Sequence, residues 1–186
     1  MHVSQVAALL GLPKPDTSIN AQVAWDTVAI LSSWLEHFDR TTWEILNKPT
    51  PSRDRTLRHL TVNTFHPFEL LPGAWTEGEF MWDARQDPER EAAMPSMEDL
   101  RAWAQSVLFT WQAFVMDHES SFEKEDHAVE TMRGTVDYSV ILTAQRWHCA
   151  FHHRQLVDFL ATEGLDMANA LNVELFSDIE LAPNIY

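Results

Sequence analysis

The chain has 186 residues, of which 45% are hydrophobic, and its 8 Trp and 10 Phe supply ample apolar surface for a buried core. This length is that of one typical domain, so we expect a single folded unit over residues 1–186. With 13 Lys and Arg against 28 Asp and Glu, the net charge is −15, which repels nucleic-acid phosphates and anionic lipid headgroups. We therefore expect neither nucleic acid nor a membrane surface as a partner.

Composition also bears on fold class and compartment. Only 5 Gly occur, fewer than the many tight turns of a sandwich or barrel require, so we expect an all-α protein. The single cysteine, Cys149, cannot form an internal disulfide, and no run approaches 18 apolar residues. The first residues lack the basic region of a secretory signal. Together these features predict a cytoplasmic protein.

The first predicted helix covers about residues 20–46. Its apolar positions recur at steps of four and three, which is typical of a helix in a bundle: Ala24, Val28, Leu31, Leu35, Phe38, Thr42 and Ile45. The opposite face carries polar residues and is expected to meet solvent: Asp26, Ser33, Glu36, Arg40 and Glu44. Two prolines at 49 and 51 end this helix.

The second predicted helix begins near Arg53 and ends at Pro72 and Gly73. Pro67 should kink or break it after His66, because proline removes a backbone hydrogen bond. A long loop follows, and its aromatic side chains are Trp75, Phe80 and Trp82. They are expected either to cover one end of the bundle or to form an exposed contact for a ligand or partner.

The third predicted helix covers about residues 97–118, after a Ser96 N-cap, and the fourth covers about 138–163, closed by Gly164. The acidic stretch 117–127 between them reads as a solvated loop rather than an ion site. Residues 166–186 form a tail that is expected to pack as a short helix or an extended arm. Four long helices predict a four-helix bundle with its core over about residues 20–165.

The fourth helix carries a polar stripe inside its apolar face. Its members align at helical spacing: Ile141, Gln145, His148, His152, Gln155 and Phe159. His148 and His152 should therefore point into the bundle, whereas His153 should face solvent. Two imidazoles four residues apart on a helix can bind one divalent ion. A buried network of His and Gln side chains without a metal explains the same stripe equally well.

The second helix has a matching stripe of His59, Asn63 and His66. If the two stripes face each other, a group from the second helix and the pair His148 and His152 would form a three-ligand site with an open position, as in catalytic zinc centres. The sequence lacks the motifs of several other metal-binding and nucleotide-binding sites. Cys149 stands where a zincin has its glutamate, no Glu lies three residues before a His, and nucleotide-binding glycine loops and calcium loops are absent.

Two segments resemble a known family. The residues from Glu130 to Asp137, followed by Arg146-Trp-His-Cys-Ala-Phe-His-His-Arg-Gln-Leu156, resemble the final helix of the DinB-like (DinB/YfiT) superfamily, where W-H-x-x-x-H-x-R-Q-L is typical. Residues 53–60 resemble the start of its second helix. The resemblance implies an up-down-down-up four-helix bundle, commonly dimeric, that holds a divalent metal by one His of helix two and two of helix four. Characterised members activate a low-molecular-weight thiol for transfer or isomerisation.

By position, His148 and His152 match the metal ligands of the fourth helix, whereas Asn63 stands where relatives carry the ligand His. Asn is a far weaker ligand for zinc or nickel than imidazole. Three outcomes follow: His66 replaces it as the ligand, His59 does so, or the ion is lost and Asn63 forms a hydrogen bond with His148 or His152 directly. The sequence thus predicts a metal-dependent, thiol-using transferase or isomerase, or a hydrolase-like enzyme, acting on a small thiol or electrophile. The alternative is a metal-free, non-catalytic bundle that binds a small ligand or a protein partner.

Overall fold

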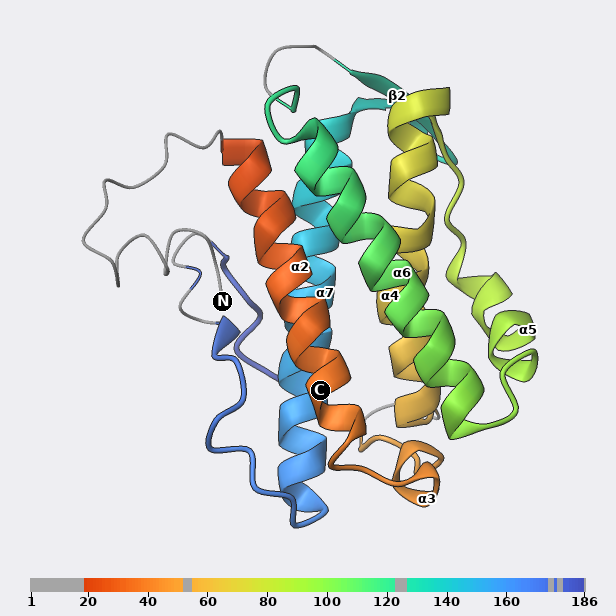
Figure 1. Ribbon diagram of the computed structural model, residues 1–186, viewed down its shortest axis with the longest axis vertical. Helices are drawn as coiled ribbons and strands as arrows, with labels where there is room; N and C mark the ends of the chain where they lie inside the picture. Colours follow the sequence, from red (N-terminus) through yellow and green to blue (C-terminus); the bar gives the residue numbers. More distant parts are fainter. Residues whose placement is uncertain (1–18, 52–54, 123–126, 174–175, 177–178, 186) are drawn as a thin grey trace.

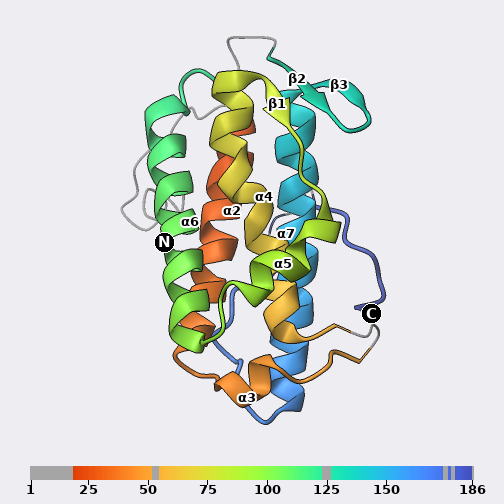
Figure 2. The same cartoon turned by 90° about the vertical axis from the view of Figure 1, so that its right-hand side faces the viewer.

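The computed structural model describes residues 19–51, 55–122, 127–173, 176 and 179–185. The protein is mostly helical, as predicted, with a small three-stranded sheet. Its long helices are α2 (Ile19–Phe38), α4 (Leu57–Glu77), α6 (Met97–His118) and α7 (Tyr138–Thr162). Helices α2 and α4 each pack against both α6 and α7 (Figures 1 and 2). No helix in the described part of the chain is long and apolar enough to cross a bilayer.

The shorter elements lie at the two ends of these helices and across one side. Helix α3 (Trp43–Leu46) lies at one end, and the 3-10 turn η1 (Ala84–Gln86) leads into α5 (Asp87–Ala92), which packs on α4 (Figure 2). Strands β1 (Glu79–Phe80), β2 (Ala128–Thr131) and β3 (Gly134–Asp137) lie at the other end. β1 pairs parallel with β2, which pairs antiparallel with β3. Loops were expected here, because strands this short show no readable periodicity.

The predicted boundaries of the first two helices are wrong. The first helix ends at Phe38, and α3 starts again after a Thr42 N-cap whose hydroxyl accepts from the Ile45 N–H. Helix α4 neither breaks at Pro67 nor ends at Pro72 and Gly73, but continues through both prolines to Glu77, and Gly78 with φ of 76° closes it. The cost of an internal proline, about 3 kcal/mol, is offset here by burial, because every residue from Leu60 to Phe68 is buried. Residues 52–54, where this helix was expected to begin, lie outside the described residues.

The expected solvent-facing sides of the first and fourth helices are partly wrong. Asp26, Ser33 and His153 are all buried, because α2 and α7 pack against each other through polar as well as apolar positions. Arg146 Nη1 donates to Asp26 Oδ2 at 3.0 Å, and Ser33 Oγ lies 3.0 Å from His153 Nε2. Each buried polar group thus meets a polar partner, which is what burial requires.

Trp75, which lies in the last turns of α4 and not in a loop as expected, and Phe80 and Trp82 after the helix divide between two roles. The ring of Trp75 stacks on His127 at 4.1 Å between centroids and meets Tyr138 edge-on at 5.0 Å. Phe80 is buried, so Trp75 and Phe80 cover one end of the helices, as one of the two predictions had it. Trp82 lies elsewhere, 5.1 Å from His148 between ring centroids.

The described part of the tail lies along α7 as an extended arm (Figure 1). Its backbone carbonyls accept hydrogen bonds from three α7 side chains. Trp147 donates to Glu180 O at 3.1 Å, Arg154 to Ala182 O at 2.9 Å, and Gln155 to Ile185 O at 2.7 Å.

Candidate functional site

A chain of hydrogen bonds connects α7, α4 and α5. His148 Nε2 lies 3.1 Å from Asn63 Oδ1, Asn63 Nδ2 donates to Asp87 Oδ2 at 2.7 Å, and His66 Nδ1 lies 2.8 Å from Asp87 Oδ1. The two helical stripes predicted from the sequence therefore meet, and they meet at Asn63. We call these four residues the His148 relay.

Asp87 is the centre of the relay and is completely buried. It begins α5, where Pro88 at the second position is favourable, and α5 lies over α4. The next turn of α5 repeats the contact, since Glu91 lies 3.0 Å from the Nδ1 of His59. Positions 87 and 91 of α5 thus face positions 63, 66 and 59 of α4. A buried carboxylate is stable only when its oxygens accept hydrogen bonds, and here both do.

The relay fixes which nitrogen of His148 carries a proton. The Asn63 amide nitrogen donates to Asp87, so the Asn63 oxygen faces His148. An amide oxygen can only accept, and therefore His148 Nε2 donates. Burial, with a smaller effect of nearby Arg55, lowers the pKa of His148 to about 4, while Asp87 opposes the shift. At neutral pH the ring is uncharged, and its Nδ1 presents a lone pair.

His152 lies one helical turn beyond His148, and the ring centroids are 4.5 Å apart. Its Nδ1 lies 2.7 Å from the Oε1 of Gln155, which also accepts from Arg55 at 3.1 Å. The amide nitrogen of Gln155 donates a hydrogen bond to the backbone oxygen of Ile185 in the tail. The second histidine of the predicted pair is thus part of a polar cluster under the C-terminal arm.

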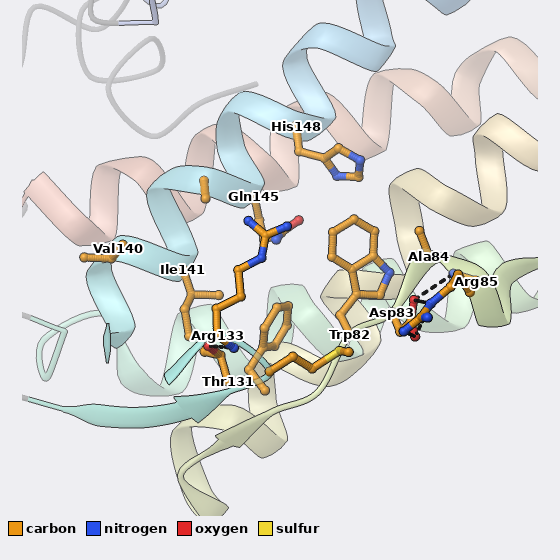
Figure 3. A pocket seen from close by; sticks show the side chains of 13 residues that line it. Trp82, Asp83, Ala84, Arg85, Thr131, Arg133, Val140, Ile141, Gln145 and His148 are labelled. Carbon is orange, nitrogen blue, oxygen red and sulfur yellow. Dashed lines mark hydrogen bonds and ion pairs between the residues drawn. The ribbon is translucent and has the colours of Figure 1, made fainter. Parts of the chain in front are cut away.

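A cleft of about 780 Å³ opens beside His148, between α7, the β2–β3 hairpin and the segment after β1 (Figure 3). We call it the His148 cleft. Its size suits a drug-sized organic molecule. Apolar and polar side chains from all three regions line it: Phe80, Trp82, Asp83, Ala84, Arg85, Thr131, Met132, Arg133, Val140, Ile141, Ala144, Gln145 and His148.

Three buried polar atoms on the lining residues have no hydrogen-bond partner among the described residues: His148 Nδ1, Gln145 Oε1 and Trp82 Nε1. The side chains that carry them lie close together in Figure 3. Unpaired buried polar atoms are rare in proteins because each costs roughly 1–3 kcal/mol. Two acceptors and one donor in a single cleft therefore indicate a place where a ligand supplies the missing partners.

The same residues can be tested as a metal centre. Among the residues the structure describes, no three His, Cys, Asp or Glu side chains are placed to hold one ion. Asn63 and His66 bond Asp87, His148 Nε2 bonds Asn63, and His152 Nδ1 bonds Gln155. This arrangement does not fit a metal ion held by three side chains. Metal binding stays a prediction.

Of the residues predicted for the site, His148, Asn63 and His66 lie in the relay, His152 lies next to it, and His59 pairs with Glu91 at its edge. Sequence reasoning missed Asp87, because Asp-Pro at the start of a short helix normally signals an exposed turn. Gln145 belonged to the predicted stripe, but nothing in the spacing showed that its oxygen would lack a partner.

No family model matches the chain, and no curated protein or solved structure is significantly similar to it. The function therefore has to follow from the geometry of the site itself.

Proposed function

We propose that this protein binds a small organic molecule in the His148 cleft and that Nδ1 of His148 accepts a hydrogen bond from it. The observation that carries the proposal is this nitrogen, which is buried, faces no partner among the described residues and belongs to a ring whose other nitrogen is held by Asn63. Gln145 adds a second acceptor with the same property.

The chemistry of His148 favours recognition over proton transfer. A general base works best when its pKa lies near the working pH, whereas the pKa of His148 is lowered to about 4. At pH 7 such an imidazole is a good hydrogen-bond acceptor and a weak base. The cleft therefore selects a ligand that carries an N–H or O–H donor, and the function we infer is that of a ligand-binding protein.

The proposal includes the finer description of the fold, an up-down-down-up four-helix bundle of the DinB-like kind. The directions of the long helices in Figure 1 support it, since α4 and α6 run together and α2 and α7 run the opposite way. In such a bundle the cleft lies beside α7, which it shares with the β2–β3 hairpin and the segment after β1. A homodimer is a further prediction of the same resemblance.

The test is a fluorescence titration with N-phenyl-1-naphthylamine, a neutral, apolar probe that has one N–H donor. We expect one saturable site, and we expect His148→Phe to weaken it about 3- to 10-fold, the value of one hydrogen bond. His118→Phe is the matched control, because His118 does not line the cleft. Circular dichroism checks that each variant is folded. Equal affinity in all variants would reject the proposal.

A metal-dependent, thiol-using enzyme is the second candidate. The close approach of the His148 and His152 rings, 4.5 Å between centroids, favours it. Such an enzyme would need a third ligand from α4, which requires Asn63 or His66 to leave Asp87. Metal content per chain, measured by mass spectrometry after loading with zinc or nickel, separates the candidates, since one ion per chain that is lost in His148→Ala/His152→Ala favours the enzyme.

A further inference from the structure

We propose that the ligand of the His148 cleft is an amphipathic organic anion whose acidic group pairs with Arg133. This inference rests on the proposed function and names the class of molecule bound. Its basis is the distribution of charge, apolar surface and unpaired polar atoms around the cleft.

Three charged side chains line the cleft, and two of them neutralise each other. Arg85 Nε donates to both carboxylate oxygens of Asp83, at 3.0 and 2.9 Å. The third, Arg133, forms no ion pair with any residue that the structure describes. The chain as a whole carries a net charge of −15, so an unpaired cation at a cleft stands out from its surroundings. An anionic ligand would give this guanidinium the partner that the described residues do not supply.

The backbone presents Arg133 to the cleft in a defined way. It lies in the two-residue turn between β2 and β3, which Gly134 closes with φ of 108°. Thr131 holds this turn, because its hydroxyl accepts from the Arg133 N–H at 3.1 Å and donates to Gly134 O at 2.6 Å. From the turn the Arg133 side chain extends toward α7 (Figure 3). The hydrogen-bonded turn of the hairpin therefore positions the Arg133 side chain at the cleft.

The remainder of the cleft is complementary to the apolar part of such a ligand. Its walls carry Phe80, Trp82 and Ile141, and the exposed Met132 and Val140 extend the apolar surface toward the rim. Aromatic and aliphatic walls of this kind bind flat or branched hydrocarbon.

The polar groups thus lie in three places: the acceptors of His148 and Gln145 on α7, the Trp82 N–H donor on the segment after β1, and Arg133 on the hairpin. A matching molecule has a hydrophobic body, an N–H or O–H donor, and a carboxylate or sulfonate elsewhere. Each feature is tied to a different side chain, so each can be tested separately.

The experiment compares two probes that differ by one charge. Both 8-anilinonaphthalene-1-sulfonate and N-phenyl-1-naphthylamine contain the same naphthalene and anilino N–H, and only the first carries a sulfonate. We expect Arg133→Met to weaken the sulfonate probe about 5-fold and to leave the neutral probe within about 2-fold, while Arg133→Lys retains most of the affinity. Added salt should weaken only the sulfonate probe.

Arg101→Met is the control for net charge, because Arg101 lies on α6, away from the cleft, and pairs with Asp39. It should change neither probe. If both probes bind at one site but Arg133→Met affects them equally, the inference of an anion is overturned while the binding function stands. If neither probe binds saturably to the folded wild-type protein, the proposed function itself fails.

Discussion

Asn63 and His148 are joined by a 3.1 Å hydrogen bond that ties α4 to α7 at the edge of a ligand-sized cleft. Asn63 accepts from His148 and donates to Asp87, so one amide orients both of its neighbours. The consequence is a histidine held in a single tautomer, whose second nitrogen has no hydrogen-bond partner among the residues the structure describes. Four side chains of three helices build this arrangement, and the proposed ligand binding rests on it.

Asp87→Leu should destabilise the protein by about 2–4 kcal/mol, because it removes the acceptor of two buried donors at once, Asn63 Nδ2 and His66 Nδ1. Urea denaturation followed by circular dichroism measures this loss. Glu89→Leu on the exposed side of the same helix is the control and should change stability by less than about 0.5 kcal/mol. A loss of equal size in both variants would mean that the relay adds nothing.

The buried pair of Asp26 and Arg146 should be costly to break on one side only. Asp26→Leu or Arg146→Met alone leaves a buried charge without its main partner and is expected to cost about 3–5 kcal/mol. Replacing both at once should cost clearly less than the sum of the two single changes. A double-mutant cycle from denaturant unfolding gives this coupling energy, and simple additivity would contradict the expectation.

Acid should destabilise the protein through His37 and His153, whose rings lie 5.9 Å apart in the core. Burial lowers the pKa of His153 to about 3, with a smaller effect of His37, and burial and Arg40 lower the pKa of His37. Both pKa values thus fall below the unfolded value of about 6.5. Their contribution to the free energy of unfolding is complete above pH 6.5 and is lost as the pH falls, because the unfolded chain then binds protons that the folded protein does not bind.

For His153 the expected loss between pH 7 and pH 5 is up to about 2 kcal/mol. Urea unfolding at both pH values measures it. His153→Gln should reduce the pH dependence, whereas His118→Gln, which lies outside this pair, should not. An unchanged dependence in His153→Gln would show that other groups cause the acid sensitivity.

Asn63→His should raise the affinity for zinc. Asn63 is already in contact with His148, which neighbours His152, so a histidine at position 63 would complete three imidazoles at one place. Isothermal titration with zinc should show much tighter binding in the variant than in the wild type. Asn63→Gln serves as the control of side-chain length. Tight, stoichiometric zinc binding by the wild type would instead support the metal-dependent enzyme.

Sequence periodicity predicted the long helices and the inward direction of His148 and His152, because apolar spacing reports which side of a helix is buried. It misjudged Asp26, Ser33 and His153, which are polar residues that become buried in pairs. The residue pattern of a single helix does not show whether a polar side chain on it meets a polar side chain of a neighbouring helix. The sequence also predicted a break at Pro67 that the structure does not show. The burial that offsets the cost of this proline comes from neighbouring elements, which the sequence of one helix does not reveal.

By itself, the sequence determined a predominantly helical chain, two histidines one turn apart on its last long helix, and a strongly acidic net charge. Only the tertiary structure brought Asp87 of a short helix between Asn63 and His66, and placed Arg133 of a hairpin beside Gln145 in one cleft. The physical reason is that hydrophobic periodicity acts along one helix, whereas hydrogen bonds and clefts arise between segments far apart in the chain. These contacts between distant segments also decide which buried polar atoms lack a partner.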